Sequence, residues 1–214
     1  MNLLKKISEV FYPTCSCYLC HKELYKKAEN YLCEDCVKTI TPCDKALTTY
    51  GSLRVYSACK YSDGGREIVL NSKDHDKPYL FKVMAGYVND TIELNELKAD
   101  MVTFVPSNKK SVKRRGYELM KDVAKEVSKK YGIEYVVAIS RRKDILDQTA
   151  VPRENRYSNV KGAFQCVYNV ENKTVIIIDD LVTTGATLNE CANILLNSGA
   201  KSVIGVTFSR ASSN

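Results

Sequence analysis

The sequence lacks any apolar run of the roughly 18–20 residues that a membrane-spanning helix requires, which excludes a transmembrane protein. Glycine and proline are scarce, with 10 and 5 among 214 residues. Hydrophobic residues make up 44% and charged residues 27%, close to the globular average, which excludes collagen-like, disordered and disulfide-scaffold chains. Residues 1–11 are too short and too interrupted by charge for a secretory signal, and no small-residue cleavage site follows them. We therefore expect a cytoplasmic globular protein, long enough for one α/β domain and a small appendage.

Nine cysteines are present, but the reducing cytoplasm that we expect for this chain disfavours disulfide bonds. Two C-x-x-C pairs lie near the amino terminus, with twelve residues between them. Each pair forms a tight turn that directs two thiolates at one point, so the two pairs can surround one Zn²⁺ tetrahedrally. Cys15 and Cys43 could substitute as ligands, although neither stands in such a pair. The sequence predicts a structural Zn²⁺ in a small ribbon, held by Cys17, Cys20, Cys33 and Cys36.

The net charge of +7 is unevenly distributed along the chain. Residues 106–143 hold 12 Lys and Arg against 4 Asp and Glu, a balance of +8, whereas all other residues together balance at −1. A cationic segment of this kind suits a polyanion, either a phosphorylated small molecule or a nucleic acid. The plainer alternative is a solvated helix face, which runs of charge usually form.

One βαβ unit near the carboxyl end contains a loop suited to phosphate. Residues 174–180 form a β-branched run that ends in two carboxylates, which predicts a central parallel strand. A loop of small residues, an amphipathic helix and a further strand over 203–208 follow it. Hydroxyls and backbone N–H groups at a helix N-terminus suit a phosphate dianion, and carboxylates beside them can accept hydrogen bonds from sugar hydroxyls. Because no Gly-Lys-Ser/Thr follows the glycine, the pattern predicts a ribose 5-phosphate site rather than a Walker loop.

The middle of the chain alternates predicted strands with predicted helices, which favours a mainly parallel sheet covered by helices. Residues 141–159 lack periodicity, and a loop of this length in an α/β domain is usually functional. We expect strands over 53–61, 101–105 and 134–139, and helices over 65–72, 78–91 and 116–131, with another helix over 3–11 before the cysteines.

The segment V-I-I-I-D-D-L-V-T-T-G-A-T, residues 175–187, resembles the phosphoribosyl-pyrophosphate (PRPP) motif of type I phosphoribosyltransferases. A four-cysteine ribbon ahead of such a domain is similar to the ComF family, known from bacterial competence for DNA uptake. The resemblance implies an α/β fold of the type I phosphoribosyltransferase class over 51–214, behind a helix and zinc ribbon over 1–50. Glu118 and Leu119 depart from the family, which usually has Asn-Gln after its R-R-G-[FY] stretch.

The resemblance also implies roles for particular residues. In the family the two acids bind the ribose hydroxyls and the T-T-G-A-T loop binds the 5-phosphate, which here are Asp179, Asp180, Thr183, Thr184, Gly185, Ala186 and Thr187. The loop at which pyrophosphate and its Mg²⁺ bind corresponds to Ser107, Asn108 and Lys109, although plain solvation explains the lysine equally well. Auxiliary positions, including a hood loop that closes over PRPP, correspond to Lys73, Arg115, Gln148 and Arg156.

Two functions remain open at this point. In the reading that we favour, the domain binds PRPP or a nucleotide end while the ribbon and the basic segment engage single-stranded DNA or a competence helicase. The alternative is an active phosphoribosyltransferase, which transfers phosphoribosyl from Mg²⁺-PRPP to a nitrogen acceptor and releases pyrophosphate. The sequence shows neither an acceptor pocket nor a general base, so catalytic residues are not assigned.

Overall fold

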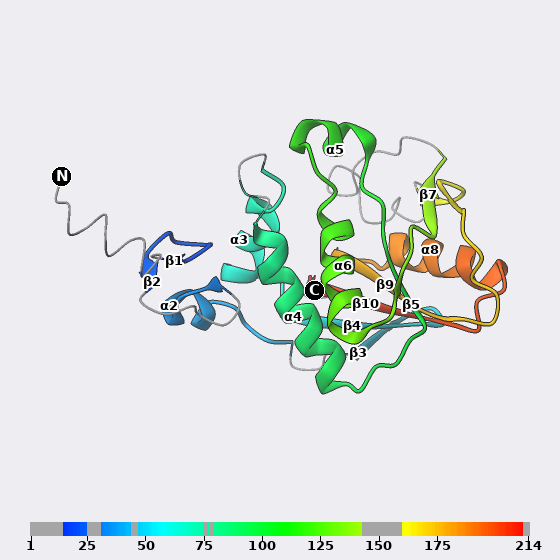
Figure 1. Ribbon diagram of the computed structural model, residues 1–214, viewed down its shortest axis with the longest axis horizontal. Helices are drawn as coiled ribbons and strands as arrows, with labels where there is room; N and C mark the ends of the chain where they lie inside the picture. The colour runs from blue at the N-terminus through cyan, green and yellow to red at the C-terminus, as the bar shows by residue number, and fades with distance from the viewer. Residues whose placement is uncertain are drawn as a thin grey trace.

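The computed structural model of the chain describes residues 15–24, 31–43, 47–74, 77, 79–142 and 160–211. A small amino-terminal unit lies at one end of the molecule, beside a central sheet that carries helices on both faces (Figure 1). The predicted helix over 3–11 lies outside the described residues. Among the described helices, none is long and apolar enough to cross a membrane.

A six-stranded sheet in the order β3-β4-β10-β9-β5-β6 forms the centre of the fold. All neighbouring strands are parallel except the edge pair β3 and β4. This arrangement confirms the predicted mainly parallel α/β sheet. The strands are β3 (Leu47–Tyr50), β4 (Leu53–Lys60), β5 (Met101–Phe104), β6 (Glu134–Tyr135), β9 (Thr174–Val182) and β10 (Ser202–Arg210). The domain boundary predicted at residue 50 falls at the turn between β3 and β4. β3 precedes this boundary in the sequence but belongs to the central sheet.

Alternate residues of β9 face two separate hydrophobic cores. Ile176 and Ile178 pack in the core that covers one face of the sheet, whereas Val175 and Ile177 pack in the core on the other face. Because side chains alternate along a strand, a continuous apolar run is buried on both sides. The first face is covered by α3 (Asp63–Asn71), α4 (Leu80–Leu94) and α6 (Leu119–Tyr131), and the second by α8 (Ala186–Asn197).

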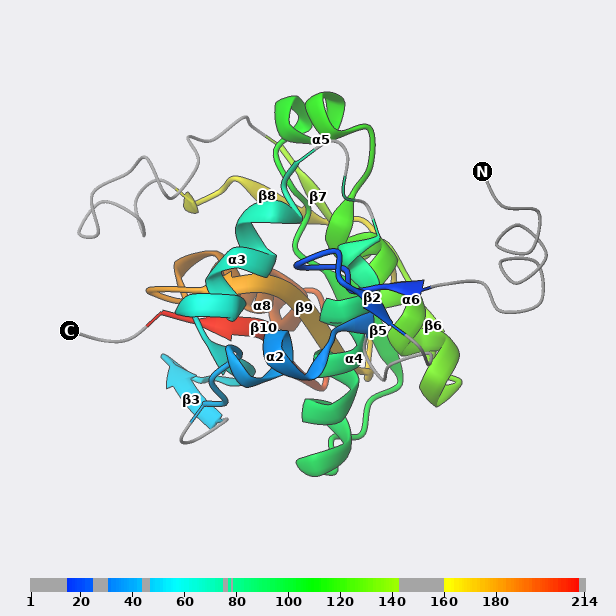
Figure 2. The same cartoon turned by 90° about the vertical axis from the view of Figure 1, so that its left-hand side faces the viewer.

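The predicted helix over 116–131 is wrong at its beginning. The structure places a separate short helix, α5 (Lys109–Arg115), which ends at Gly116, and α6 begins only at Leu119. Gly116 has a φ of 83° and its N–H donates to the carbonyl of Val112, which is the left-handed helix end that glycine favours. The basic run therefore belongs largely to α5, which projects beyond the sheet in both views (Figures 1 and 2).

The strand predicted over 134–139 is also interrupted. Only β6 joins the sheet, and the chain then leaves it to form β7 (Ile139–Arg141), which pairs antiparallel with β8 (Phe164–Cys166). The link between the two is anchored, because the N–H of Ala138 donates to the buried hydroxyl of Thr103 at 3.2 Å. The chain thus turns out of the sheet beside the carboxyl end of β5.

The amino-terminal unit consists of a two-stranded hairpin, β1 (Cys15–Ser16) and β2 (Glu23–Leu24), and the short helix α2 (Glu34–Lys38). It lies against α3 and α4, toward the viewer in Figure 2. Tyr18 stacks on Tyr31 with ring centroids 4.8 Å apart and meets the ring of Tyr79 at 4.6 Å. Lys82 of α4 lies 5.3 Å from the centre of the Tyr31 ring. Aromatic contacts therefore attach the ribbon to the beginning of α4.

Candidate functional site

The loop from Thr183 to Gly185 connects β9 to the first turn of α8. Gly185 adopts a φ of 73°, in the left-handed region that favours glycine. The N–H of Ala186 donates to the hydroxyl of Thr184 at 3.4 Å, and the carbonyl of Gly185 accepts from Asn189 at 2.8 Å. The loop thereby sets hydroxyls and backbone N–H groups at the N-terminus of a twelve-residue helix, where an anion is stabilised.

Tyr50, the last residue of β3, supports this loop from behind. Its hydroxyl donates to the carbonyl of Thr183 at 3.5 Å. A Cβ atom added at Gly185 would lie 2.3 Å from the Tyr50 ring, so the loop and the ring approach as closely as a glycine permits. Sequence reasoning missed Tyr50, since 133 residues separate it from Thr183 and no local pattern marks the contact.

Two carboxylates stand near the carboxyl end of β9, immediately before the loop. Asp180 forms an ion pair with Lys73 at 3.1 Å, and its N–H donates to Asp179 Oδ1 at 3.0 Å. Burial raises the pKa of Asp179 well above its ordinary value, and the charge of Asp180 raises it further. The charge of Asp180 likewise raises the pKa of Lys73, which favours the ammonium form. Asp180 is therefore a carboxylate whose charge Lys73 balances, whereas Asp179 is a buried carboxyl group with a raised pKa.

Tyr117 holds the turn that carries Lys73. Its hydroxyl lies 2.7 Å from the carbonyl of Ser72 and 3.0 Å from that of Asp74, and Arg115 lies 5.8 Å from the centre of its ring. The tyrosine follows Gly116 at the end of α5, so one side chain connects the basic helix to the turn that carries Lys73. The predicted auxiliary residue Lys73 is thus fixed beside Asp180 by a contact that spans 45 residues of sequence.

The segment after β5 is held by a network of charged groups. Glu118 accepts from the Ser107 hydroxyl at 2.5 Å and from the Ser107 N–H at 3.1 Å. Arg115 Nη2 donates to Ser107 Oγ at 3.0 Å, and Arg141 Nε donates to the carbonyl of Pro106 at 2.7 Å. Burial raises the pKa of Glu118, although the bonds from Ser107 and the two arginine charges act in the opposite direction. Sequence reasoning noted Glu118 as a departure but gave neither it nor Arg141 a place in the site.

These elements enclose one cavity of about 430 Å³, bounded by the end of β9, the residues after β5, α5 and the Lys73 turn. A smaller hollow of about 20 Å³ lies at the loop itself, between Asp179 and Leu188. Lys109 is exposed and is not among the cavity-lining residues, while Gln148 and Arg156 lie outside the described residues. The predicted site residues that line the larger cavity are Lys73, Ser107, Asn108, Arg115, Asp179, Asp180 and Thr187.

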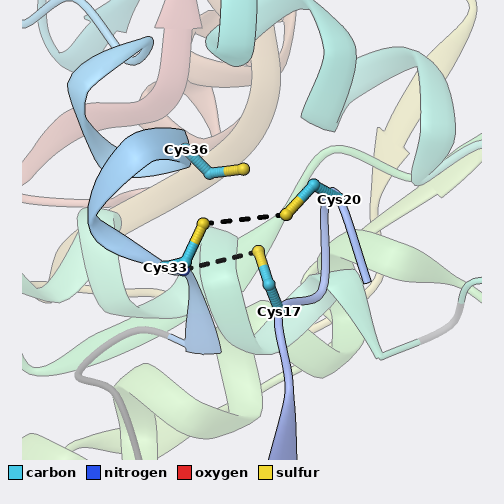
Figure 3. A group of neighbouring side chains, drawn as sticks. All are labelled: Cys17, Cys20, Cys33 and Cys36. Carbon is cyan, nitrogen blue, oxygen red and sulfur yellow. Dashed lines mark hydrogen bonds between the residues drawn. The ribbon is translucent and has the colours of Figure 1, made fainter. Parts of the chain in front are cut away.

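The four predicted cysteines come together in the ribbon, and their side chains point toward one centre (Figure 3). All four sulfur atoms lie within 4.8 Å of one another, and Cys20 Sγ lies 3.6 Å from Cys33 Sγ. Around a tetrahedral Zn²⁺ with Zn–S bonds of about 2.3 Å, sulfur atoms are about 3.8 Å apart. The cluster therefore fits a metal ion such as zinc and leaves no position open for a substrate.

The ionisation of these thiols also favours a metal. Burial alone would raise the pKa of Cys17, but hydrogen bonds from the backbone, including the N–H of Cys33 at 3.4 Å, lower it to about 6. Burial raises the pKa of Cys36, and the neighbouring thiols raise it further. Without a positive ion the cluster cannot hold four thiolates, because each charge disfavours the next.

Comparison with known proteins places the carboxy-terminal part of the chain. Residues 111–213 match the phosphoribosyl transferase domain family. The DNA utilization protein YhgH of Escherichia coli O157:H7 is 38% identical over 66 residues, which are 31% of this chain and 29% of that protein. The ribose-phosphate pyrophosphokinase of Bacillus subtilis is 33% identical over 70 residues, which are 30% of this chain and 22% of that enzyme.

A solved structure, of the allosteric regulatory enzyme of purine biosynthesis, matches 60% of this chain and 26% of that chain, with 21% identity and a TM-score of 0.42. The two sequence alignments above span less than a third of the length of the relatives that they match. The family match includes the last five residues of α5, the acidic pair and the Thr183–Thr187 loop. Residues 111–213 therefore match a phosphoribosyl transferase domain, and over part of its length the chain is similar to a DNA utilization protein.

Proposed function

We propose that the segment from Asp179 to Thr187 binds the ribose 5-phosphate part of PRPP or of a related phosphoribosyl ligand. The observation that carries the proposal is the shared cavity, which Asp180 and Thr187 line together with Arg114 and Arg115 of α5. Carboxylates suit the ribose hydroxyls as acceptors, and the start of α8 suits the phosphate. Thr183, Thr184, Gly185 and Ala186 supply that start, close to the smaller hollow.

We propose further that Mg²⁺ accompanies PRPP at this site. Carboxylate oxygens are the ligands that Mg²⁺ prefers, and Asp179 and Asp180 provide them. Because Lys73 already pairs with Asp180, a contact through water suits the ion better than direct coordination. When bound, Mg²⁺ would neutralise the pyrophosphate charge beside the proposed pyrophosphate residues Ser107, Asn108 and Lys109. We keep Gln148 and Arg156 as proposed auxiliary residues.

In the ribbon, we propose Zn²⁺ as the resident ion of the cysteine cluster, with a structural role. Four sulfur ligands form a closed tetrahedral shell, which zinc favours and which offers no catalytic position. We propose residues 1–50 as the ribbon unit and residues 51–214 as the ligand-binding domain, although β3 (Leu47–Tyr50) of the first segment adds an edge strand to the sheet of the second. A cytoplasmic location agrees with cysteines kept as thiols for a metal.

Replacing Asp180 by asparagine is expected to weaken PRPP binding about ten- to a hundredfold. The change keeps the size of the side chain and removes a charge-assisted acceptor for a ribose hydroxyl, worth roughly 1.5–3 kcal/mol. Calorimetric titration with Mg²⁺-PRPP measures the loss, and a thermal melt shows whether the variant is folded. Asp122→Asn, a carboxylate on α6 outside the cavity lining, is the matched control. Equal affinity of Asp180→Asn and the native protein would refute the assignment.

We propose that this ligand site serves DNA uptake or use. The similarity to the DNA utilization protein YhgH supports this role, as does the basic helix α5. Arg114 and Arg115 line the cavity, whereas Lys109, Lys110 and Lys113 are exposed and do not. One short helix thus presents charge to the ligand and to the solvent, which suits simultaneous contact with a DNA backbone or with a helicase partner.

Single-stranded DNA is expected to bind to the outward lysines of α5 without sequence preference, because phosphate contacts carry no base information. Replacing Lys110 and Lys113 by glutamate should weaken binding strongly and reduce the log–log salt slope by about 1.4, at roughly 0.7 for each phosphate contact. Fluorescence anisotropy of a labelled oligonucleotide at several salt concentrations measures both effects. The matched control reverses Lys173 and Lys201, which are exposed near the amino-terminal ends of β9 and β10. Equal losses in both variants would show a nonspecific charge effect and overturn the assignment to α5.

An active phosphoribosyltransferase is the second candidate function. The observation that favours it is the cavity volume of about 430 Å³, which lies in the range of small-molecule substrate sites. Incubation with Mg²⁺-PRPP and a panel of nucleobases, followed by pyrophosphate detection, separates the two functions. Acceptor-dependent pyrophosphate release would establish the enzyme, whereas PRPP binding without turnover would support the binding module.

A further inference from the structure

Glu118 lies behind the part of the cavity wall that Ser107 forms, after the end of β5. Its carboxylate takes both hydrogen-bond donors of Ser107, the N–H at 3.1 Å and the hydroxyl at 2.5 Å. Ser107 lines the cavity, whereas Glu118 does not. The carboxylate therefore binds both donors of Ser107 from outside the cavity. Neither the N–H nor the hydroxyl of Ser107 is then available to donate a hydrogen bond to an anion in the cavity.

The same wall is otherwise built for an anion. Arg114 and Arg115 line it, and Arg115 is only 5% exposed. Arg115 Nη2 donates to Ser107 Oγ, while its buried Nε has no hydrogen-bond partner. A guanidinium this deeply buried needs negative charge nearby, and Glu118 supplies it from within the protein. The positive charge of the wall is therefore partly neutralised before a ligand arrives.

We propose that Glu118 determines which phosphoribosyl ligand the site accepts, by disfavouring a diphosphate on C1 of the ribose. A monophosphorylated pentose such as ribose 5-phosphate uses the Asp179–Thr187 segment and needs nothing from the Ser107 wall. PRPP adds a diphosphate that meets a loop without its two donors and a carboxylate directly behind it. The diphosphate then adds little affinity, and the cavity takes ribose 5-phosphate or a nucleotide 5′-monophosphate about as well as PRPP. This inference rests on the proposed phosphoribosyl site.

Replacement of Glu118 by glutamine tests the inference with almost no change in shape. The glutamine Oε1 can still accept the Ser107 N–H, but its amide nitrogen donates to Ser107 Oγ instead of accepting from it. The hydroxyl proton becomes available to the ligand, and one negative charge disappears from behind the wall. One charge-assisted hydrogen bond corresponds to about ten- to a hundredfold in affinity, so PRPP should gain at least about tenfold.

The experiment is calorimetric titration of the native protein and Glu118→Gln with ribose 5-phosphate and with PRPP, both in the presence of Mg²⁺. In the native protein we expect the two affinities to agree within about tenfold. In Glu118→Gln we expect PRPP to bind at least about tenfold tighter, while ribose 5-phosphate stays within about twofold. Asp122→Asn removes the same charge one turn further along α6 without touching Ser107, and it should leave the affinity ratio unchanged.

Each other outcome has a definite meaning. If the native protein binds neither ligand, the proposed phosphoribosyl site fails and the inference fails with it. If ribose 5-phosphate binds but PRPP binds more than about a hundredfold tighter, the site stands and the role of Glu118 is overturned. This comparison uses the native protein alone, so a poorly folded variant does not affect it. An equal gain in Asp122→Asn would assign the effect to total charge and would also overturn the positional role.

Discussion

Replacing Cys33 by serine is expected to release the metal and to unfold the ribbon while the six-stranded sheet stays folded. Cys33 is buried, and its backbone N–H also donates to the thiol of Cys17, so the residue serves two positions of the cluster. Structural Zn²⁺ contributes roughly 10–16 kcal/mol to small domains at neutral pH, and a segment of this size has no comparable apolar core. Metal analysis should fall from about one equivalent per chain toward zero.

Cys166→Ser is the matched control for this change. Cys166 lies in β8, only partly exposed, and its thiol donates to the carbonyl of Tyr168 rather than joining the cluster. It should retain the metal. Limited proteolysis should cut Cys33→Ser within residues 15–43 and leave the control intact. Because Tyr18 and Tyr31 attach the ribbon to α4, faster amide exchange at the start of α4 should accompany the loss. A Cys33→Ser protein that keeps one equivalent of metal would contradict the assigned ligand set.

The second large effect is expected for Gly185→Ala, which should abolish phosphoribosyl binding and lower the stability of the domain. A left-handed φ of 73° costs an alanine about 1–2 kcal/mol, and the new Cβ would stand 2.3 Å from the Tyr50 ring. Overpacking of a fixed contact adds about 1–3 kcal/mol. The sum of about 2–5 kcal/mol corresponds to a fall in melting temperature of roughly 5–15 °C for a chain of this length.

Gly132→Ala separates the two causes. Gly132 ends α6 with a φ of 64°, but no atom lies within 4 Å of the position that its Cβ would take. Thermal unfolding of this control should show the conformational cost alone, and its ligand affinity should be unchanged. The difference between the two variants measures the contact with Tyr50. Equal falls in melting temperature would show that the contact with Tyr50 adds nothing to the loss of stability. Retained ligand binding by Gly185→Ala would show that the close approach of the loop to the Tyr50 ring is not needed for binding.

The sequence predicted well those parts of the molecule that are defined by residues a few positions apart in the chain. The doubled C-x-x-C pattern placed all four thiols correctly, because each pair lies in one turn of chain. The apolar run of β9 predicted a strand buried on both faces, and Ile176 and Ile177 do face opposite cores. These features depend on residues a few positions apart, which a pattern can capture.

The failures have two physical causes. The helix predicted from residue 116 failed because Gly116 was taken as the start of a helix, whereas its left-handed conformation ends one. Tyr50 and Arg141 escaped notice for a different reason, since each acts on a residue far away in sequence. Glu118 was noticed only as a departure, because its hydrogen bonds to Ser107 depend on how α6 meets the end of β5. Tertiary contacts of this kind leave no periodic trace in the chain.

The position of β10 has a consequence for synthesis of the protein. β10 lies between β4 and β9 and pairs with both, and the buried hydroxyls of Ser57 and Thr207 meet across β4 and β10 at 2.8 Å. The two residues are 150 positions apart, which a ribosome takes roughly 10–30 s to translate. Throughout that interval β4 has no parallel neighbour in the sheet, so its inner edge stays open to pairing with other nascent chains. Production of this protein is therefore expected to depend on chaperone capacity more than its finished stability would suggest.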